Sequence, residues 1–243
     1  MVFTWENTLI VYKNTLTNFS YAENEYMVMC HGNGVIDNYQ FCIIQMLWRI
    51  RWIMHKQRLF IMRGRNMAIL STERLIMRPL QIDDLDDVFN YSCTPNVGPN
   101  AGWKPHESKE ETLEIMNAIF LNKDTVWGIE QKETGRIIGS IGLIDDQKRE
   151  YDMVKMIGYA IGEAYWGKGF MTEAIKEVIK FGFEELHLAA ISAYCFPFNK
   201  RSKNIIKKCN FDYEGTLKMA EKIFNGNVYD NDCYLLTAQR YSS

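Results

Sequence analysis

The stretch that most constrains the fold is residues 163–174, which read E-A-Y-W-G-K-G-F-M-T-E-A. An apolar segment at 153–162 predicts a buried strand before it, and apolar residues recur at helical spacing after it as far as Phe183. We therefore expect a strand, a tight turn containing Gly167 and Gly169, and a helix. Glycines let backbone N–H groups crowd around one point, and the N-terminus of a helix favours an anion there. The stretch predicts a phosphate-binding turn.

A Gly-x-Gly pair alone is weak evidence, because most such pairs are ordinary turns. Downstream, an apolar run at 188–196 predicts another strand, followed by N-K-R-S at 199–202, a helix to Cys209 and F-D-Y-E-G at 211–215. With these motifs in this order, the chain resembles the GNAT acetyltransferases. Within that superfamily, W-G-K-G-F-M-T-E-A, N-x-x-S and F-x-x-E-G are similar to the ribosomal-protein N-terminal acetyltransferase branch. The resemblance covers about residues 67–240.

Charge and cysteine usage narrow the function classes. Residues 67–243 carry 21 Lys and Arg against 26 Asp and Glu. An acidic domain argues against a general nucleic-acid binder and is compatible with an amine-bearing substrate. The six cysteines form no C-x-x-C pair and no Cys/His cluster of metal spacing, so we expect no metal site and reduced thiols in a cytoplasmic protein. Cys195 and Cys209 fit small buried hydrophobes better than nucleophiles.

Residues 1–66 carry none of these motifs. Their strongest apolar segment, residues 41–54, is too short to span a bilayer and contains two central arginines. It suits either an amphipathic helix at a membrane surface or part of a poorly ordered appendage or non-native translated leader, and we favour the second interpretation. We expect residues 1–66 to be an extension and residues 67–243 to be the acetyltransferase domain, with Met67 a candidate natural start.

The order of the expected elements predicts the fold class. A first strand at 74–80 precedes two helices, at about 83–91 and 108–121, and the second helix opens at an S-x-x-E capping box. Between the helices, residues 93–105 read as a loop rich in Pro and Gly. Two β-rich runs joined by K-E-T-G then predict a hairpin. We expect an α+β, GNAT-like fold with a central mixed, mostly antiparallel sheet of six to seven strands and helices on both faces.

The resemblance implies acetyl-CoA as the acetyl donor. Backbone N–H groups of the turn, helped by the Thr172 hydroxyl, are expected to hold its pyrophosphate. A bulge in the preceding strand would free backbone groups for the pantetheine arm, and one N–H would stabilise the thioester oxyanion. Asn199 would hold the cofactor arm and also suits a helix N-cap. The implied cofactor-binding residues are Tyr159, Ala160, Ile161, Trp166, Gly167, Lys168, Gly169, Phe170, Met171, Thr172, Asn199 and Ser202.

The resemblance also implies a proton donor and a base. Many GNAT enzymes place a Tyr where this chain has Ile206, which cannot donate a proton. In the ribosomal-protein serine acetyltransferase type the N-x-x-S serine has that role, which implies Ser202. That type carries a general base in an Ala-Glu pair before an Asn-Gly turn, which implies Glu221. The alternative for Glu221 is a solvated Glu at a strand end, and Glu163 and Glu130 are the next candidates for the base.

Two family features place further residues. The loop at 93–105 borders the acceptor site in the family, so Trp103 and His106 either contact the substrate or pack the loop. Ala164 replaces the Gln or Arg that the family uses before the turn. That replacement removes one side-chain contact with acetyl-CoA and leaves the backbone cradle.

Two function classes stay open. The first is an acetyl-CoA-dependent N-acetyltransferase acting on a primary amine. The expected acceptor is a protein N-terminal α-amino group, and the alternative is a small-molecule amine such as an antibiotic or a polyamine. The second class is a non-catalytic acetyl-CoA-binding module, which Ala164 and Ile206 motivate. We expect no nucleic-acid or membrane partner, and a homodimer stays open. Thiol release with a panel of amines separates the classes.

Overall fold

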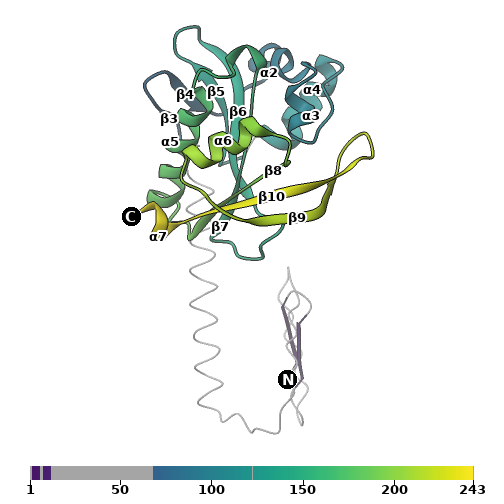
Figure 1. Cartoon of the computed structure of the whole chain (residues 1–243), viewed down its shortest axis with the longest axis vertical. Coiled ribbons are helices and arrows are strands. Elements are labelled where there is room, and N and C mark those ends of the chain that lie inside the picture. Colours follow the sequence, from purple (N-terminus) through teal and green to yellow (C-terminus); the bar gives the residue numbers. More distant parts are fainter. Residues whose placement is uncertain (1, 6–7, 12–67, 122, 243) are drawn as a thin grey trace. The chain divides into compact units, whose positions relative to one another are not determined.

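The computed structural model describes residues 2–5, 8–11, 68–121 and 123–242 (Figure 1). The chain divides into two compact units, Met1–Ile61 and Met62–Ser243. In the first unit, β1 (Val2–Trp5) pairs antiparallel with β2 (Thr8–Val11). The segment 41–54, on which the amphipathic-helix alternative depends, lies outside the described residues.

The second unit is built on an eight-stranded sheet with the order β3-β4-β5-β6-β7-β8-β10-β9. Strands β7 and β8 are parallel and every other neighbouring pair is antiparallel, which confirms the expected mixed, mostly antiparallel sheet. The strands are β3 (Leu70–Ser71), β4 (Leu75–Arg78), β5 (Val126–Gln131), β6 (Arg136–Asp145), β7 (Val154–Ile161), β8 (Ala190–Cys195), β9 (Asp212–Lys222) and β10 (Val228–Thr237).

The strand count is eight, where six to seven were expected. The additional strand is β3, which has two residues and is too short to produce an alternating apolar pattern. Strand β6 shows why the sheet is covered on both sides, since seven consecutive residues in it are buried. A run of that kind indicates a strand with protein on both faces.

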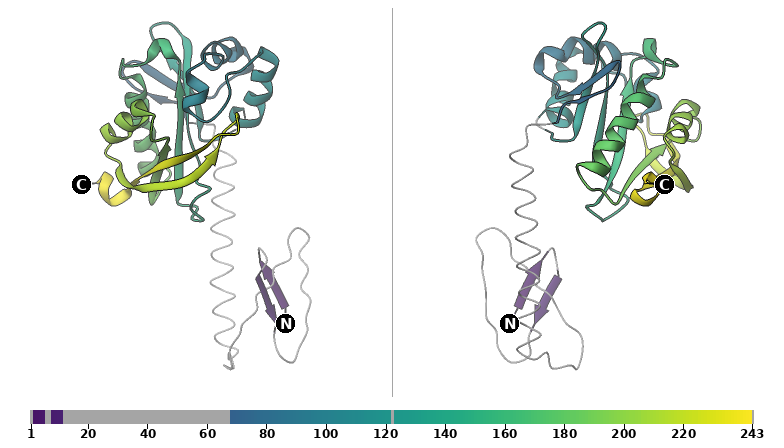
Figure 2. Two further views of the ribbon diagram at one scale, coloured as in Figure 1. Left: turned by 45° about the vertical axis from the view of Figure 1, so that its right-hand side comes forward. Right: turned by 90° about the vertical axis from the view of Figure 1, so that its left-hand side faces the viewer.

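Helices cover both faces of the sheet, as expected (Figure 2). One core cluster packs α5 and α6 against the sheet, and the second packs α2, α3 and the turn after α4 against it. The α-helices of this unit are α2 (Leu85–Ser92), α3 (Val97–Asn100), α4 (Lys109–Ile115), α5 (Phe170–Glu184), α6 (Lys200–Lys208) and α7 (Ala238–Tyr241). Shorter turns are η1 (Ile82–Asp84), η2 (Met116–Phe120) and η3 (Glu163–Tyr165).

Two local expectations need adjustment. The predicted loop at 93–105 contains the short helix α3, because Pro99 lies in its first turn, where a missing N–H costs nothing. The predicted second helix consists of α4 followed by the π-turn η2. Its cap is as expected at Ser108, whose Oγ accepts from Glu111 N at 3.1 Å, but the Glu111 carboxylate accepts from Glu107 N at 2.7 Å.

The sheet opens at its centre. Strands β7 and β8 pair only between Val154–Met156 and Ala190–Ser192. Strand β7 continues to Ile161 and β8 to Cys195, while β6 and β10 pair with their outer edges. Because the last residues of β7 and β8 have no strand between them, backbone groups there are available to a ligand.

Candidate active site

The Gly-x-Gly turn lies between β7 and α5, as the sequence predicts. Gly167 and Gly169 have φ values of 75° and 84°, the left-handed region that glycine adopts without a Cβ penalty. Gly169 is the N-cap of the 15-residue helix α5. Gly167, Lys168 and Gly169 are exposed. The first N–H groups of α5 therefore face solvent beside a cationic side chain, which suits a phosphate.

The side chains of the other predicted turn residues point either into the core or toward the surface. Phe170 and Met171 are buried in the core, so only their backbone groups can reach a ligand at the surface. Trp166 donates its indole N–H to Ile161 O at 2.9 Å, and the Arg201 guanidinium lies 4.0 Å from its ring centroid. Thr172 is half-buried in the first turn of α5.

A clamp that sequence reasoning missed supports this turn. Arg74 lies in the turn before β4, and its Nε donates to Glu173 Oε2 at 2.7 Å. Another guanidinium nitrogen donates to Lys168 O at 3.1 Å, and the guanidinium carbon lies 4.4 Å from the Phe170 ring centroid. Burial raises the pKa of Glu173, but hydrogen bonds from Thr72 and Arg74 outweigh it and lower the pKa overall. The sequence did carry one signal for this contact, namely the acidic residue Glu173 in the first turn of the predicted helix.

The open edge of β7 exposes backbone groups without the expected bulge. The β6–β7 ladder keeps one register from Gly139↔Ile161 to Asp145↔Lys155. Gly162 N donates to Ile138 O, so the alternation of an antiparallel ladder turns the backbone of Ala160 toward β6. Tyr159 and Ile161 then direct their N–H groups toward the opening. Divergence of β7 from β8, and not a bulge, frees them.

Helix α6 brings Ser202 to this opening. Asn199 is the N-cap of α6, and its Oδ1 accepts from Ser202 N at 3.0 Å. Its Nδ2 donates to Asn100 O at 3.0 Å, which ties α6 to the end of α3. The Ser202 hydroxyl lies 2.7 Å from the Tyr159 hydroxyl of β7. Ile206 is buried in the core, so this helix carries an apolar side chain at that position.

Glu221 is half-buried on β9, opposite Tyr229 of β10. Its Oε2 accepts from the Nδ2 of the buried Asn231 at 3.1 Å. A Cβ placed on Gly102, whose φ is +91°, would lie 2.7 Å from Glu221 Oε1. Residues 100–102 therefore contact the start of α6 through Asn100 O and lie beside the Glu221 carboxylate at Gly102. Glu221 therefore has Asn231 as a hydrogen-bond partner and lies beside Gly102, near the end of β9.

The other residues considered for acceptor contact or proton removal are occupied elsewhere. His106 is buried, its Nδ1 lies 2.9 Å from Thr112 Oγ1, and burial lowers its pKa. Trp103 packs on Gly98 and on the His106 ring. Glu163 accepts from Asn96 N and Nδ2 at 3.0 Å, and Glu130 pairs with Arg78 at 2.6 Å. Glu221 is the carboxylate among these that lies beside Gly102 of the 93–105 segment.

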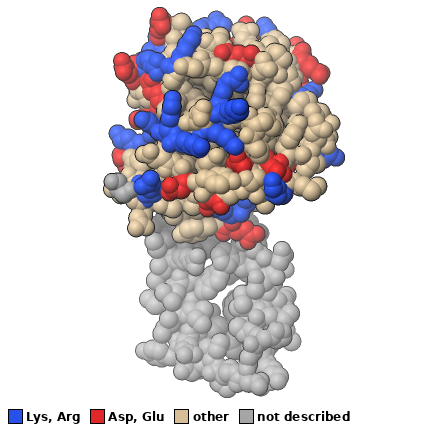
Figure 3. Space-filling view, viewed as in Figure 1, with Lys and Arg blue, Asp and Glu red and all other residues tan. Residues whose placement is uncertain are grey.

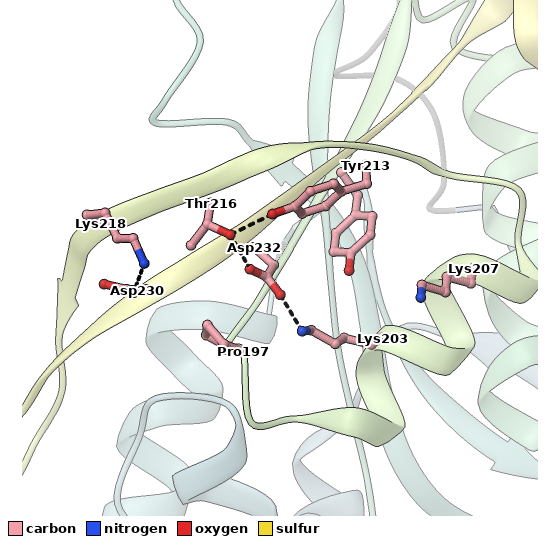
Figure 4. Close-up of a pocket in the computed structure, with 9 residues that line it drawn as sticks. Pro197, Lys203, Lys207, Tyr213, Thr216, Lys218, Asp230 and Asp232 are labelled. Atoms are coloured by element: carbon pink, nitrogen blue, oxygen red, sulfur yellow. Dashed lines mark hydrogen bonds and ion pairs between the residues drawn. The ribbon is translucent and has the colours of Figure 1, made fainter.

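A separate pocket of about 490 Å³ lies between α6 and the β9–β10 hairpin (Figure 4). Its polar groups pair mostly with one another: Lys203 with Asp232 at 2.5 Å, Lys218 with Asp230 at 2.9 Å, and Thr216 with Asp232 at 2.6 Å. It contains none of the predicted site residues. Lys and Arg side chains gather on the face that carries α6, whose nine residues include five basic and no acidic ones (Figure 3).

The described residues hold neither a metal-binding cluster nor a membrane-spanning helix. No group of three or more His, Cys, Asp or Glu side chains in the described part of the chain is arranged to hold a metal ion. No helix in the same part is long and apolar enough to cross a membrane.

The fold and the open strand pair define a class of protein, and comparison with known families identifies it. Residues 74–212 match the acetyltransferase (GNAT) domain. The chain therefore belongs to the GNAT family of N-acetyltransferases, and the resemblance found in the sequence is confirmed. Enzymes of this family use acetyl-CoA and act on an amine acceptor.

Individual relatives agree with this assignment. The N-acetyltransferase YoaA of Bacillus subtilis, whose function is uncharacterised, is 32% identical over 71% of this chain and 98% of its own length. The ribosomal-protein-S5-alanine acetyltransferase of Vibrio fischeri has the same fold, with a TM-score of 0.56 and 22% identity over 70% of this chain and 97% of that one. The microcin C7 self-immunity acetyltransferase MccE, solved with acetyl-CoA and AMP, covers 68% of this chain and 93% of its own at 21% identity, with a TM-score of 0.59.

Proposed function

We propose that this protein transfers the acetyl group of acetyl-CoA to the α-amino group of a protein N-terminus. The observation that carries the proposal is the opening between β7 and β8, which has the Gly-x-Gly turn after β7 and Ser202 of α6 beside it. Residues 100–102 link the start of α6 to the neighbourhood of Glu221. The choice of a protein N-terminus is supported by the likeness to an S5-alanine acetyltransferase and by the match of Ser202 and Glu221 to the serine-acetyltransferase pattern.

The residues of the opening fit acetyl-CoA. Exposed backbone at Gly167, Lys168 and Gly169 offers N–H donors and a lysine to a pyrophosphate. The free edge at Tyr159 and Ile161 offers N–H donors to the amide-rich pantetheine arm, and Asn199 orders the start of α6 next to it. When bound, acetyl-CoA supplies an acetyl group activated as a thioester.

Glu221 and Ser202 then divide the proton chemistry. An amine attacks only in its neutral form, so Glu221 takes its proton directly or through a water molecule. An N–H group of Tyr159 or Ile161 stabilises the negative charge that develops on the carbonyl oxygen. The Ser202 hydroxyl donates to the sulfur atom as the bond between carbon and sulfur breaks.

The test is thiol release from acetyl-CoA with matched acceptors. Peptides with free N-terminal Ala or Ser are expected to react, and the same peptides with a blocked N-terminus and an internal Lys are not. Polyamines and aminoglycosides cover the small-molecule alternative. Faster reaction of a small amine than of every free N-terminus would contradict the proposed acceptor, and no reaction despite tight acetyl-CoA binding would favour a non-catalytic module.

A further inference from the structure

A hydrogen bond joins the two elements that border the opening, because the Tyr159 hydroxyl of β7 lies 2.7 Å from the Ser202 hydroxyl of α6. We propose that Tyr159 is a positioning residue whose hydroxyl donates to Ser202 Oγ and thereby aims the Ser202 hydrogen at the sulfur of the leaving thiol. This inference rests on the proposed function, which takes Ser202 as the donor to sulfur. It gives the Tyr159 side chain a role beyond the backbone contact assigned to that residue.

The direction of the bond follows from the chemistry of the two hydroxyls. A phenol is a better hydrogen-bond donor than an alkyl hydroxyl, and either oxygen can accept. The Tyr159 ring packs against the core, and burial raises its pKa well above the usual range, with the Ser202 bond lowering it only in part. Tyr159 therefore keeps its proton across the working pH range. With Tyr159 as donor, the hydrogen of Ser202 is free to point elsewhere.

The Cys195 thiol interacts with the same hydroxyl. Burial raises the pKa of the Cys195 thiol to about 11, and a hydrogen bond with Ser202 opposes that effect. Cys195 is the last residue of β8, so the Ser202 hydroxyl interacts with side chains from both strands that diverge at the opening.

The bond between Tyr159 and Ser202 supplies the phenol that Ile206 lacks. Helix α6 has an apolar, fully buried side chain there and offers no phenol from that position. The phenol comes instead from β7, 43 residues before Ser202, and acts through the serine. As the bond between carbon and sulfur breaks, the electron pair stays on sulfur and the Ser202 hydrogen bond stabilises it. The proton that Glu221 removes from the amine reaches the thiol through solvent, so charge and atoms balance.

The first experiment needs no acceptor. Calorimetry on the full chain compares CoA with acetyl-CoA between about pH 7 and pH 9.5, a range that spans ordinary thiol pKa values. Acetyl-CoA has no free thiol, so the ratio of the two affinities cancels the titration of phosphates and lysines. A donor aimed at sulfur lowers the pKa of the bound thiol, and the ratio should then rise in favour of CoA with pH. Tyr159→Phe and Ser202→Ala both remove or weaken the hydrogen bond to the charged sulfur of CoA. Each variant should therefore reduce the rise of the affinity ratio roughly 10-fold or more.

Tyr91→Phe is the matched control. Tyr91 is also buried and its hydroxyl bonds a serine, Ser140, at 3.2 Å, so it loses a comparable bond elsewhere in the same unit. Its ratio should follow the wild type. Replacing Tyr159 with 3-fluorotyrosine keeps the shape and strengthens the donor, so this variant should raise the ratio and covers the case in which Tyr159→Phe does not fold. A ratio that is the same in the wild type and in the Tyr159 variants overturns the inference.

The second experiment uses turnover with the best acceptor. If Tyr159 acts through Ser202, the variant with both Tyr159→Phe and Ser202→Ala should turn over no more slowly than Ser202→Ala alone when both are saturated with acetyl-CoA. If the double variant instead loses turnover by the product of the two single effects, the inference is overturned. Absence of any acetyl transfer by the wild type, combined with the expected pH dependence of CoA binding, would instead refute the proposed function and leave the role of Tyr159 toward sulfur standing.

Discussion

At the scale of single residues, the site depends on a few side chains placed by contacts that span long stretches of sequence. Glu221 is the clearest case, because one carboxylate oxygen accepts from Asn231 and the other would lie 2.7 Å from a Cβ placed on Gly102. A carboxylate fixed in this way loses less freedom when it accepts a proton from a bound amine. The role of Glu221 can therefore be tested by a substitution that keeps the shape of its side chain.

Glu221→Gln should lower kcat about 10²-fold or more with little change in acetyl-CoA affinity, because glutamine keeps the shape and cannot act as a base. Steady-state kinetics over pH, with calorimetry for binding, measures both. The rising limb of the wild-type pH profile should flatten or shift in the variant.

Glu214→Gln is the control, since Glu214 lies on the same strand and pairs with Arg149. Gly102→Ala offers an independent route, because the added methyl group would displace the Glu221 carboxylate. It should lower kcat in the same direction. Wild-type turnover and pH dependence in Glu221→Gln would place the base elsewhere.

At the scale of secondary-structure elements, the turn before α5 carries the cofactor prediction. A Cβ added at Gly167 would meet no other atom within 4 Å, so the requirement for glycine there comes from its φ of +75° and from the ligand. A β-branched residue is strained in that region by about 1–2 kcal/mol. Replacing the glycines of this turn therefore tests its role, and a glycine of similar φ elsewhere serves as the control.

Gly167→Val and Gly169→Val should raise the dissociation constant of acetyl-CoA by about 10-fold or more, because the turn must abandon the conformation that presents its N–H groups. Calorimetry measures this. Gly135→Val, at φ +65° with no neighbour within 4 Å, imposes similar strain in the β5–β6 turn and should leave affinity unchanged. Equal affinities in all three variants would refute the phosphate assignment.

A second element-scale prediction concerns Asp146, which follows β6 and ties it to β8. Its buried carboxylate accepts from Ser192 Oγ at 2.6 Å, Tyr194 OH at 2.8 Å and Arg149 at 2.9 Å. Burial raises its pKa, but these bonds and one from Lys148 N outweigh it, so the folded-state pKa lies below the ordinary value. The resulting stability is present above the unfolded pKa of about 3.9 and is lost as pH falls through the folded pKa.

The free energy of unfolding measured in urea should therefore fall between about pH 6, 4 and 3. Part of this fall should be absent in Asp146→Asn. At neutral pH that variant should be less stable by about 1–3 kcal/mol, because the amide cannot accept from all of these donors. An unchanged slope between pH 4 and pH 3 would show that Asp146 does not contribute to the acid limb.

At the scale of the whole molecule, the open prediction is the domain boundary. Ala68 O accepts the indole N–H of Trp127 at 2.6 Å, and both Leu70 and Trp127 are buried in the core. Residues 68–70 therefore belong to the packed part of this unit.

A chain beginning at Met67 should keep the melting temperature and acetyl-CoA affinity of the full chain. A chain beginning at Thr72 lacks β3 and leaves the Trp127 N–H unpaired, which should cost about 1–3 kcal/mol, or roughly 2–12 °C for a domain of this size. Differential scanning calorimetry compares the three. Loss of solubility or a large drop in melting temperature for the Met67 version would show that residues 1–66 stabilise the domain.

Local sequence patterns were enough to predict the elements near the turn and the family. The strand before the turn, α5, α6 and the N-caps at Ser108 and Asn199 all lie where local patterns predict them. These features depend on periodicity and on capping within a few residues, which a single sequence displays directly. The two-residue strand β3 and the short helix α3 fall below that limit.

The assembly of the site depends instead on contacts between elements that are distant in the sequence. The clamp of Arg74 on Glu173 joins residues 99 positions apart, and Tyr159 meets Ser202 across 43. The free edge of β7 exists because β7 and β8 part after Met156 and Ser192, a consequence of how two strands with a helix between them pack in one sheet. Such contacts depend on the positions of whole elements, and local propensity carries no information about them.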